Sequence, residues 1–446
     1  MITAVIVIFI LGYLTIVFEH PLKLDKTVPA LIMGALCWAL IAMGDLDVID
    51  HHHKVGKMKD VLLHHIGKVA EILFFLLGAM TIVELVDLHK GFAVITNRIQ
   101  TTSKTRMMWM ICILAFFLSA TLDNLAATIV LVSLLRRLVP DKMERLWFVS
   151  MGVIAANAGG AWSPIGDVTT TMLWIGEKVS TQGLIVALVI PSIVCIAVPA
   201  FIASYLKAFK GEITLAEIDQ ESSRQQEKLL SSQIMLFVGV GALIFVPVFK
   251  IVTGLPPYVG MMLSLGIVWL VSEYIHPEED FHESRRAMYS AHHALSRIEM
   301  SSILFFLGIL VAVAALESIA IMGANGQQEG LLKFLAEGLQ NAIPNQDIVV
   351  MLLGAFSAVI DNVPLVAASM GMYTEPMDSK LWHFIAYAAG TGGSMLIIGS
   401  AAGVAAMGME RIDFIWYLKN IAWLAFAGFL AGSVVFIGMS YFIFPT

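Results

Sequence analysis

The sequence predicts an all-α protein that crosses a membrane many times, and three observations lead to this class. Hydrophobic residues make up 58% of the 446 residues and charged residues only 14%, with a mean hydropathy of +0.84. Ordinary soluble domains carry about 25% charged residues. Apolar runs near the ~20 residues that a helix needs to cross a bilayer recur along the chain. Two similar polar motifs, Ser119–Asn124 and Ser357–Asn362, interrupt such runs.

Uninterrupted apolar runs are each expected to form one transmembrane helix in the lipid bilayer. They occupy residues 2–18, 27–43, 69–86, 183–205, 231–250, 256–274, 300–316 and 415–443. The last is long enough to require a tilt. Residues 329–342 have the pattern of an amphipathic surface helix.

Four further regions are interrupted and do not fit a simple span. Residues 106–139 and 347–372 carry an Asp-Asn pair in the middle, and each flank is too short to cross the bilayer comfortably. We expect these two regions to be re-entrant helical hairpins. Residues 146–176 and 381–409 are long enough to cross but contain glycine-rich interruptions at 157–167 and 390–400. We expect two broken helices there.

The interrupted regions match each other at a nearly constant offset, which predicts an internal duplication. Asp361 falls on Asp123, and Gly392 and Gly399 fall on Gly159 and Gly166. With about five crossings per copy, an odd number, the second copy enters the membrane from the opposite side and forms an inverted repeat. The expected units are 1–205 (scaffold helices 1–88, hairpin 106–139, broken helix 146–176, closing helix 183–205), a cytoplasmic linker 206–230, and 231–446 (scaffold helices 231–316, hairpin 347–372, broken helix 381–409, closing helix 415–443).

Charge distribution sets the expected orientation and excludes some partners. If the N-terminus is periplasmic, most of the 27 Lys and Arg residues fall on cytoplasmic loops, among them Arg136, Arg145 and Arg285. This is the distribution that the positive-inside rule expects. We therefore expect a multi-pass protein of the bacterial inner (plasma) membrane with a periplasmic N-terminus. The net charge of −7 is spread over loops, so nucleic acid is not an expected partner.

Cysteine and histidine residues give weaker signals. Cys37, Cys112 and Cys195 are an odd number without paired spacing, so we expect buried thiols rather than a disulfide or a metal site. Five histidines in the 44–68 loop, His51 to His53, His64 and His65, allow a solvated polar loop or a metal or pH sensor, and the first is the simpler interpretation. Glu84, Asp87 and Glu317 lie near helix ends, where pairing or snorkelling is expected.

The interrupted centre has the chemistry of a cation site. Asp123, Asp167 and Asp361 lie at membrane depth with no Lys or Arg near them in sequence, and oxygen ligands suit a hard cation. The alternative is that each Asp only caps a half-helix. A buried carboxylate that holds either a proton or a cation supplies the competition that antiport requires.

At these residues the sequence resembles the NhaD-type sodium/proton antiporters of the ion transporter superfamily. The most specific matches are Thr121–Asn124, Asn157–Thr170 and Ile360–Pro364. The resemblance implies a homodimer, elevator-like alternating access, and exchange of sodium, with lithium as a second cation, for protons, which serves pH homeostasis.

The resemblance also implies a set of functional residues. Those expected to bind the cation or the proton are Asp123, Asn124, Asn157, Asp167, Thr169, Thr170, Ser357, Asp361 and Asn362, with Ser394 and Ser400 as weaker candidates. Sodium is expected at Asp123, Asn124, Asp167, Asp361 and Asn362. Ser400 stands where the first copy has Asp167, and Gly390 where it has Asn157. The ion site should therefore lie closer to the first copy.

Two rival functions remain. Transporters of dicarboxylates, citrate or arsenite belong to the same superfamily, but their sites would favour neutral groups at both hairpin tips. An intramembrane aspartyl protease could use Asp167 and Asp361, yet only a bare Gly166-Asp167 pair is present. We expect a transporter without a cofactor rather than an enzyme.

Overall fold

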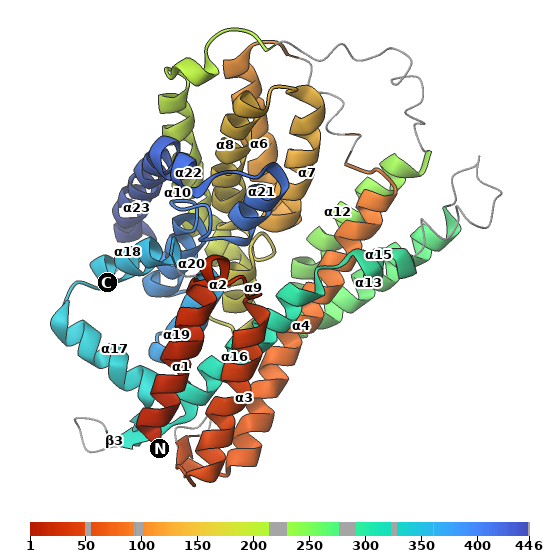
Figure 1. Cartoon of the computed structure of the whole chain (residues 1–446). Helices are drawn as coiled ribbons and strands as arrows, with labels where there is room; N and C mark the ends of the chain where they lie inside the picture. The colour runs from red at the N-terminus through yellow and green to blue at the C-terminus, as the bar shows by residue number, and fades with distance from the viewer. Residues whose placement is uncertain are drawn as a thin grey trace.

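The computed structural model describes residues 1–49, 55–92, 94, 101–213, 230–275, 291–322, 328–359 and 361–444. These residues are mostly helical (Figure 1). His51 to His53, Arg285 and most of the predicted linker lie outside the described residues.

Helices of the first half follow the predicted order. They are α1 (Ile2–Val17), α2 (Glu19–Leu22), α3 (Thr27–Met43), α4 (Met58–Leu88), α6 (Lys104–Thr121), α7 (Asn124–Leu138), α8 (Lys142–Gly160), α9 (Val168–Ile175), α10 (Thr181–Ala203) and the short 3-10 helix η1 (Lys207–Phe209). The strands β1 (Val48–Ile49) and β2 (Val55–Gly56) pair antiparallel.

The second half has a similar series. Its helices are α12 (Leu230–Thr253), α13 (Pro257–Tyr274), α15 (Ala291–Arg297), α16 (Met300–Ser318), α17 (Leu331–Ala342), α18 (Gln346–Ser357), α19 (Asn362–Met372), α20 (Lys380–Gly392), α21 (Ala401–Glu410), α22 (Phe414–Asn420) and α23 (Ala422–Ile443). Strands β3 (Ala320–Met322) and β4 (Gln328–Gly330) also pair antiparallel. The two short ribbons are an addition to the all-α prediction.

Two predicted spans differ from the structure. The span at 69–86 belongs to α4, which begins at Met58, so part of the predicted 44–68 loop is helical. The span at 415–443 is not one tilted helix, because the chain breaks at Ile421 between α22 and α23. The side-chain amide of Asn420 donates to the carbonyl of Trp416 (2.7 Å). Such a local bond competes with the backbone hydrogen bonds of a continuing helix.

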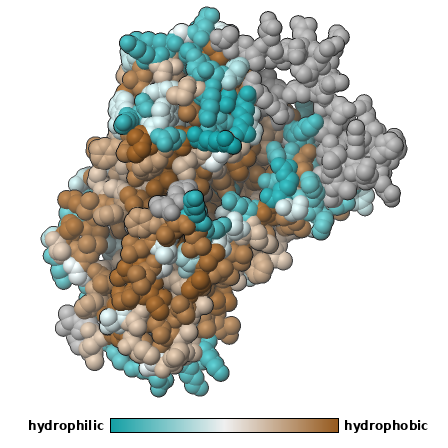
Figure 2. All heavy atoms as spheres, in the orientation of Figure 1, coloured by the Kyte–Doolittle hydropathy of each residue, from teal (hydrophilic) through white to brown (hydrophobic). Residues whose placement is uncertain are grey.

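The described residues contain six helices that are long and apolar enough to cross a membrane. These are Met58–Leu88, Lys104–Thr121, Thr181–Ala203, Ser231–Thr253, Met300–Ser318 and Ala422–Ile443. Figure 2 shows a broad apolar surface with hydrophilic residues at the two ends of the molecule. Large apolar side chains such as Phe237 and Val252 are more than 70% exposed. An apolar exterior of this extent is typical of a multi-pass membrane protein.

Helices from the two halves of the chain pack against one another. In Figure 1, α6, α7, α8 and α10 gather with α20 to α23, whereas α1, α3, α4 and α16 form a second group. The helix α10 packs along α23, and α3 packs along α16. Cys37, Cys112 and Cys195 are buried free thiols, as predicted. The helix breaks described next lie where these groups meet.

Candidate ion-binding site

Asp123 ends one helix and begins the next. It lies between α6 and α7 with a φ of 145°, in a region that L-residues seldom adopt and that costs about 1–3 kcal/mol. Its Oδ1 accepts a hydrogen bond from the Ala126 backbone N–H (2.6 Å) and caps α7. Asp361 caps α19 in the same way, accepting from the Val363 N–H (3.2 Å). Asp123 and Asp361 therefore each make the helix cap that the capping alternative describes, through one carboxylate oxygen.

Asp167 differs from both, because it makes no side-chain cap at the start of α9. Its buried carboxylate accepts hydrogen bonds from Asn124 Nδ2 (3.0 Å), from Asn362 Nδ2 (3.2 Å) and from the Thr169 hydroxyl. These donors come from α7, α19 and α9. Because an ionised carboxylate only accepts hydrogen bonds, this shell fits the charged form.

Asn157 near the end of α8 joins the two halves of the chain. Its Oδ1 accepts from Asn124 Nδ2 (3.0 Å), and its Nδ2 donates to Ser394 Oγ (2.8 Å) and to Ser400 Oγ (2.9 Å). All of these side chains are buried. The two serines, predicted as weaker candidates, are thus direct members of the network, and Asn157 has its acceptor and both donors satisfied.

Thr170 and Ser357 are buried but bond to backbone carbonyls. Thr170 Oγ1 donates to the Asp167 carbonyl (2.9 Å), and Ser357 Oγ donates to the carbonyls of Gly354 (2.8 Å) and Ala389 (3.3 Å). The structure does not bring either hydroxyl to a carboxylate. The Thr170 bond lies in the first turn of α9, next to Asp167, and the Ser357 bonds lie at the end of α18.

Glycine allows α8 to touch α6 and α20 to touch α18. A Cβ on Gly159 would overlap the Phe116 carbonyl of α6, and a Cβ on Gly392 would overlap the Gly354 carbonyl of α18. These two glycines are the ones that the sequence match pairs with each other. The close approach packs the end of α8 against α6, which ends shortly before Asp123, and the end of α20 against α18, which ends shortly before Asp361.

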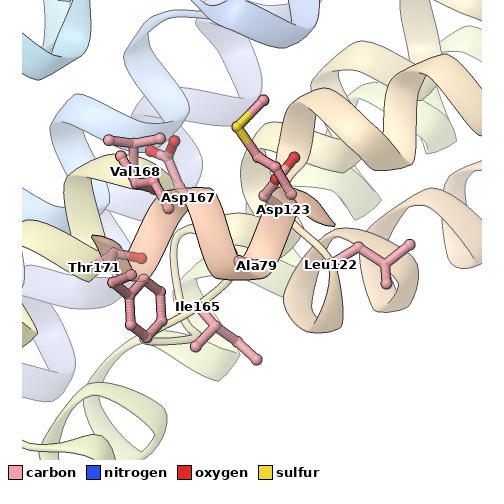
Figure 3. A pocket seen from close by; sticks show the side chains of 10 residues that line it. Ala79, Leu122, Asp123, Ile165, Asp167, Val168 and Thr171 are labelled. Carbon is pink, nitrogen blue, oxygen red and sulfur yellow. The ribbon is translucent and has the colours of Figure 1, made fainter. Parts of the chain in front are cut away.

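A small pocket lies between the first interruption and α4 (Figure 3). Asp123, Asp167 and Thr171 supply its polar wall, and Ala79 and Met80 of α4 lie opposite. The cavity has a volume of about 10 Å³, which is about enough for one water molecule or one bare ion. The sequence predicted Thr169 and Thr170 as site residues but not Thr171. The α4 wall was missed because apolar residues in a span carry no chemical signal.

Asp361 does not line this pocket. Its Oδ2 accepts from Lys26 Nζ at 2.9 Å, and the two side chains are only 14% and 22% exposed. Lys26 lies far away in sequence and was missed. The available signal was length: α1 and α3 have 16 and 17 residues, so each reaches only about 24–26 Å. Two helices shorter than the ~30 Å core can place the polar connection between them inside it.

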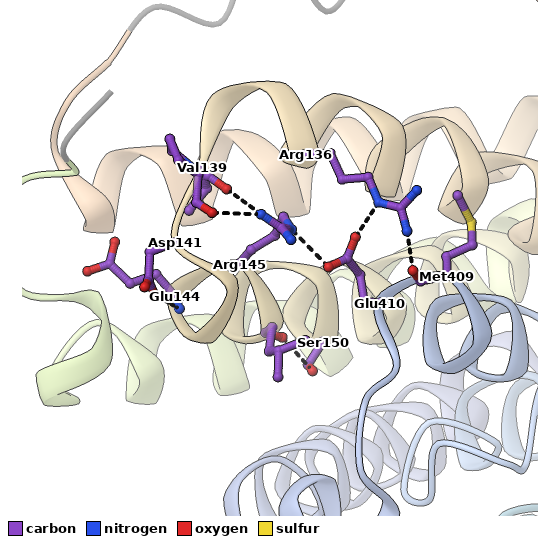
Figure 4. Close-up of polar contacts among 10 residues, drawn as sticks. Arg136, Val139, Asp141, Glu144, Arg145, Ser150, Met409 and Glu410 are labelled. Carbon is purple, nitrogen blue, oxygen red and sulfur yellow. Dashed lines mark hydrogen bonds and ion pairs between the residues drawn. The ribbon is translucent and has the colours of Figure 1, made fainter. Parts of the chain in front are cut away.

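Charged groups near the C-terminal end of α7 form a separate cluster around Glu410 (Figure 4). Glu410, which ends α21, is buried and accepts from Arg136 Nε of α7 (2.6 Å) and from Arg145 Nε of α8 (2.8 Å). Arg136 also donates to the Met409 carbonyl, and Arg145 to the Val139 carbonyl. This Glu410 cluster connects α7, α8 and α21.

Other predicted polar groups are paired away from the centre. Glu84 and Asp87 of α4 both bond Arg297, at 3.2 and 3.0 Å, as expected for carboxylates near a helix end. Within the described part of the chain, no group of three His, Cys, Asp or Glu side chains is placed to hold a metal ion.

Fold and site together define a class: a multi-pass α-helical membrane protein with a buried centre of carboxylates and amides. A family model described as citrate transporter matches residues 5–383. Sodium/proton antiporter 1 of Arabidopsis thaliana is 44% identical over 99% of this chain and 74% of the relative. Sodium/proton antiporter 2 of the same plant is 42% identical over 98% of this chain and 99% of the relative.

A bacterial relative extends the comparison. The Na(+)/H(+) antiporter NhaD of Alkalimonas amylolytica is 29% identical over 96% of this chain and 89% of its own length. The chain belongs to the citrate transporter family and, within it, to the NhaD-type sodium/proton antiporters. Since the relatives come from a plant as well as from bacteria, they do not single out the bacterial inner membrane.

Proposed function

We propose that the protein exchanges sodium, with lithium as a second cation, for protons across its membrane. The observation that carries this proposal is the placement of Asp123 and Asp167 on one pocket of about one-water size. Two carboxylates in a medium of low dielectric repel each other unless a cation lies between them or one is protonated. Sodium and protons then exclude each other from the same place, and the names of the relatives agree with such an exchange.

Each polar residue of the centre has a distinct part in this proposal. Asp123, Asp167 and Thr171 offer oxygens to the cation, which a hard ion such as sodium prefers. Asn124 and Asn362 orient the Asp167 carboxylate through their amide N–H groups. Asn157 helps to hold Asn124 in place, because its Oδ1 accepts from the same Nδ2 that donates to Asp167.

We further propose the inverted-repeat architecture, with units 1–205 and 231–446, hairpins 106–139 and 347–372, and broken helices 146–176 and 381–409. Three pairs of features support it. Asp123 and Asp361 each cap the second arm of a hairpin, and Gly159 and Gly392 each approach the first arm. The residues that follow the two capping aspartates, Asn124 and Asn362, both reach Asp167, as tips entering from opposite faces would.

Movement between two groups of helices would expose the pocket to each side in turn. Phe75, Leu76, Ala79 and Met80 of α4 form one wall, and the interrupted helices form the other. We propose that the interrupted helices slide along α4 in an elevator-like cycle, within a homodimer whose contacts are made by scaffold helices. A bacterial inner membrane, a periplasmic N-terminus and a role in pH homeostasis complete the proposal.

The description of the family model raises citrate as a second candidate substrate. Citrate carries several carboxylates, which Asp123 and Asp167 would repel, and it does not fit a space suited to one water. Proteolysis is disfavoured too, because an aspartyl dyad shares a proton between adjacent carboxylates, whereas Asp361 is paired with Lys26.

Everted membrane vesicles loaded with a pH-sensitive dye test the proposal. Sodium and lithium should dissipate an imposed proton gradient, and potassium should serve as the comparison ion. Uptake of labelled citrate under the same conditions addresses the rival. Citrate uptake without any cation-driven proton movement would refute the proposed exchange.

A further inference from the structure

Lys26 is fixed to the scaffold and reaches into the centre. The backbone N–H of its neighbour Thr27 donates to Asp25 Oδ1 (2.8 Å), and the Thr27 hydroxyl donates to the Ser301 carbonyl of α16 (3.0 Å). The Lys26 ammonium lies 4.5 Å from the centroid of the Phe305 ring, also on α16, and 2.9 Å from Asp361 Oδ2. The ammonium is therefore held between an aromatic face and a carboxylate at the tip of the α18–α19 pair.

This placement is not explained by the needs of α3. Lys26 is the residue that precedes the first turn of α3, where the helix dipole disfavours a positive charge. Asp361, in contrast, is well placed at the start of α19 and already has a capping bond there. A cation at an unfavourable helix end, partly buried against the Asp361 carboxylate, indicates a function for the charge itself.

The pair is connected to the ion pocket through one residue. Asn362 follows Asp361 directly and donates to Asp167 Oδ2 at 3.2 Å. Asp167 in turn lines the pocket together with Asp123. A charge at the Lys26–Asp361 pair therefore acts on Asp167 through Asn362 in a partly buried environment, where salt screens charges less than at the surface.

We infer that Lys26 is a tethered counter-cation that occupies Asp361 and sets the balance between sodium and protons at Asp167. This inference rests on the proposed exchange. With Lys26 in place, the pair contributes no net charge, and the pocket holds the two charges of Asp123 and Asp167. Without Lys26, Asp361 would add a third negative charge, which strengthens proton binding at Asp167 and moves the competition to higher pH.

Other titratable groups act on the pair and stay constant in the test. Glu19 and Asp25 from the α1–α3 connection and Glu299 before α16 act on Lys26. The Tyr13 phenol of α1 and Asp167 act on Asp361. Apart from the phenol these are carboxylates, so they do not replace the positive charge that Lys26 supplies.

Two single variants alter the charge in opposite directions. Lys26→Gln leaves the pair with one negative charge, and Asp361→Asn leaves it with one positive charge. The pH at which protons double the apparent sodium KM should rise by about one unit in the first and fall by about one unit in the second, as for a unit charge at about 10 Å in an effective dielectric of about 20.

Lys26→Arg and the double variant Lys26→Gln/Asp361→Asn should keep the wild-type midpoint, because both leave the pair neutral. Lys23→Gln is the matched control, since Lys23 is an exposed lysine of the same connection. Sodium-dependent dye dequenching at a series of pH values measures the midpoint for every variant.

The outcomes separate the inference from the proposed function. If wild-type vesicles show no sodium-driven proton movement, the exchange itself is refuted. If the wild type is active and the two single variants move the midpoint in the same direction or not at all, Lys26 has only a structural part and the inference is overturned. Opposite shifts that cancel in the double variant establish it, and Asp361→Asn with Lys26→Arg still decides the case if Lys26→Gln does not fold.

Discussion

Replacing Asp167 by Asn removes one charge from the pocket while keeping the volume of the side chain. At ~4 Å and an effective dielectric of about 20, a unit charge attracts a cation by about 4 kcal/mol. At 1.4 kcal/mol per factor of ten, sodium affinity should fall by roughly a thousandfold. The new NH₂ group also cannot accept from its partners, and one lost buried hydrogen bond costs about 1–3 kcal/mol of stability. We therefore expect loss of transport in a protein that still folds.

Dye dequenching in everted vesicles measures the transport, and thermal unfolding in detergent measures the stability of the same variant. Asp141→Asn is the matched control, because Asp141 is an exposed aspartate that caps α8 by accepting from the Glu144 N–H (2.8 Å). Because Asn caps a helix about as well as Asp, that variant should lose little stability and keep its sodium dependence. Sodium-driven exchange by Asp167→Asn at near wild-type sodium concentrations would refute the assigned role of the carboxylate.

Three further predictions follow from the same contacts. Apparent sodium affinity should weaken as pH falls, because protons occupy the carboxylates that bind sodium, and equal affinity at two pH values would contradict a shared site. Glu410→Gln should lower the unfolding free energy by about 3 kcal/mol, because two arginines lose the buried carboxylate that pairs with them. An unchanged melting temperature would show that the Glu410 cluster does not stabilise the protein. Cysteines placed at Leu122 and Val359, in a protein without native thiols, should cross-link with a yield that depends on sodium. If both cysteines react with impermeant reagents only from one common side of the membrane, the inverted-repeat proposal is wrong.

Much of the centre could be predicted because its residues break a rule of membrane sequences. Polar side chains such as Asp123 and Asn157 are costly at membrane depth, so their presence in apolar runs is a signal in itself. Glycine in the same runs marks the places where a helix ends or approaches another closely, and Gly159 and Gly392 are found at such contacts. Both signals are local, and both led to the helix breaks.

The remaining features depend on contacts between distant segments. Lys26 lies in a polar connection, where a lysine is ordinary, and only packing brings it to Asp361. Ala79 and Met80 are apolar residues of an apolar helix, so nothing in their chemistry distinguishes the wall of the pocket from its neighbours. The break at Ile421 lies next to Asn420, whose side chain bonds the Trp416 carbonyl, and a hydropathy pattern does not register such a bond.

The hydroxyls of Ser394 and Ser400 have a consequence for the ancestry of the molecule. If the two units descend from one gene that was once present as two identical chains, the positions of Asp167 and Ser400 would have carried the same residue, and an ancestor with aspartate there would have had that charge twice. Asn157 would then have faced a carboxylate at the Ser400 position. The added negative charge would have required an additional cation in the centre. A serine accepts the same hydrogen bond without charge. Fusion into a single chain would have allowed this asymmetry to arise, because each copy could then change without its twin.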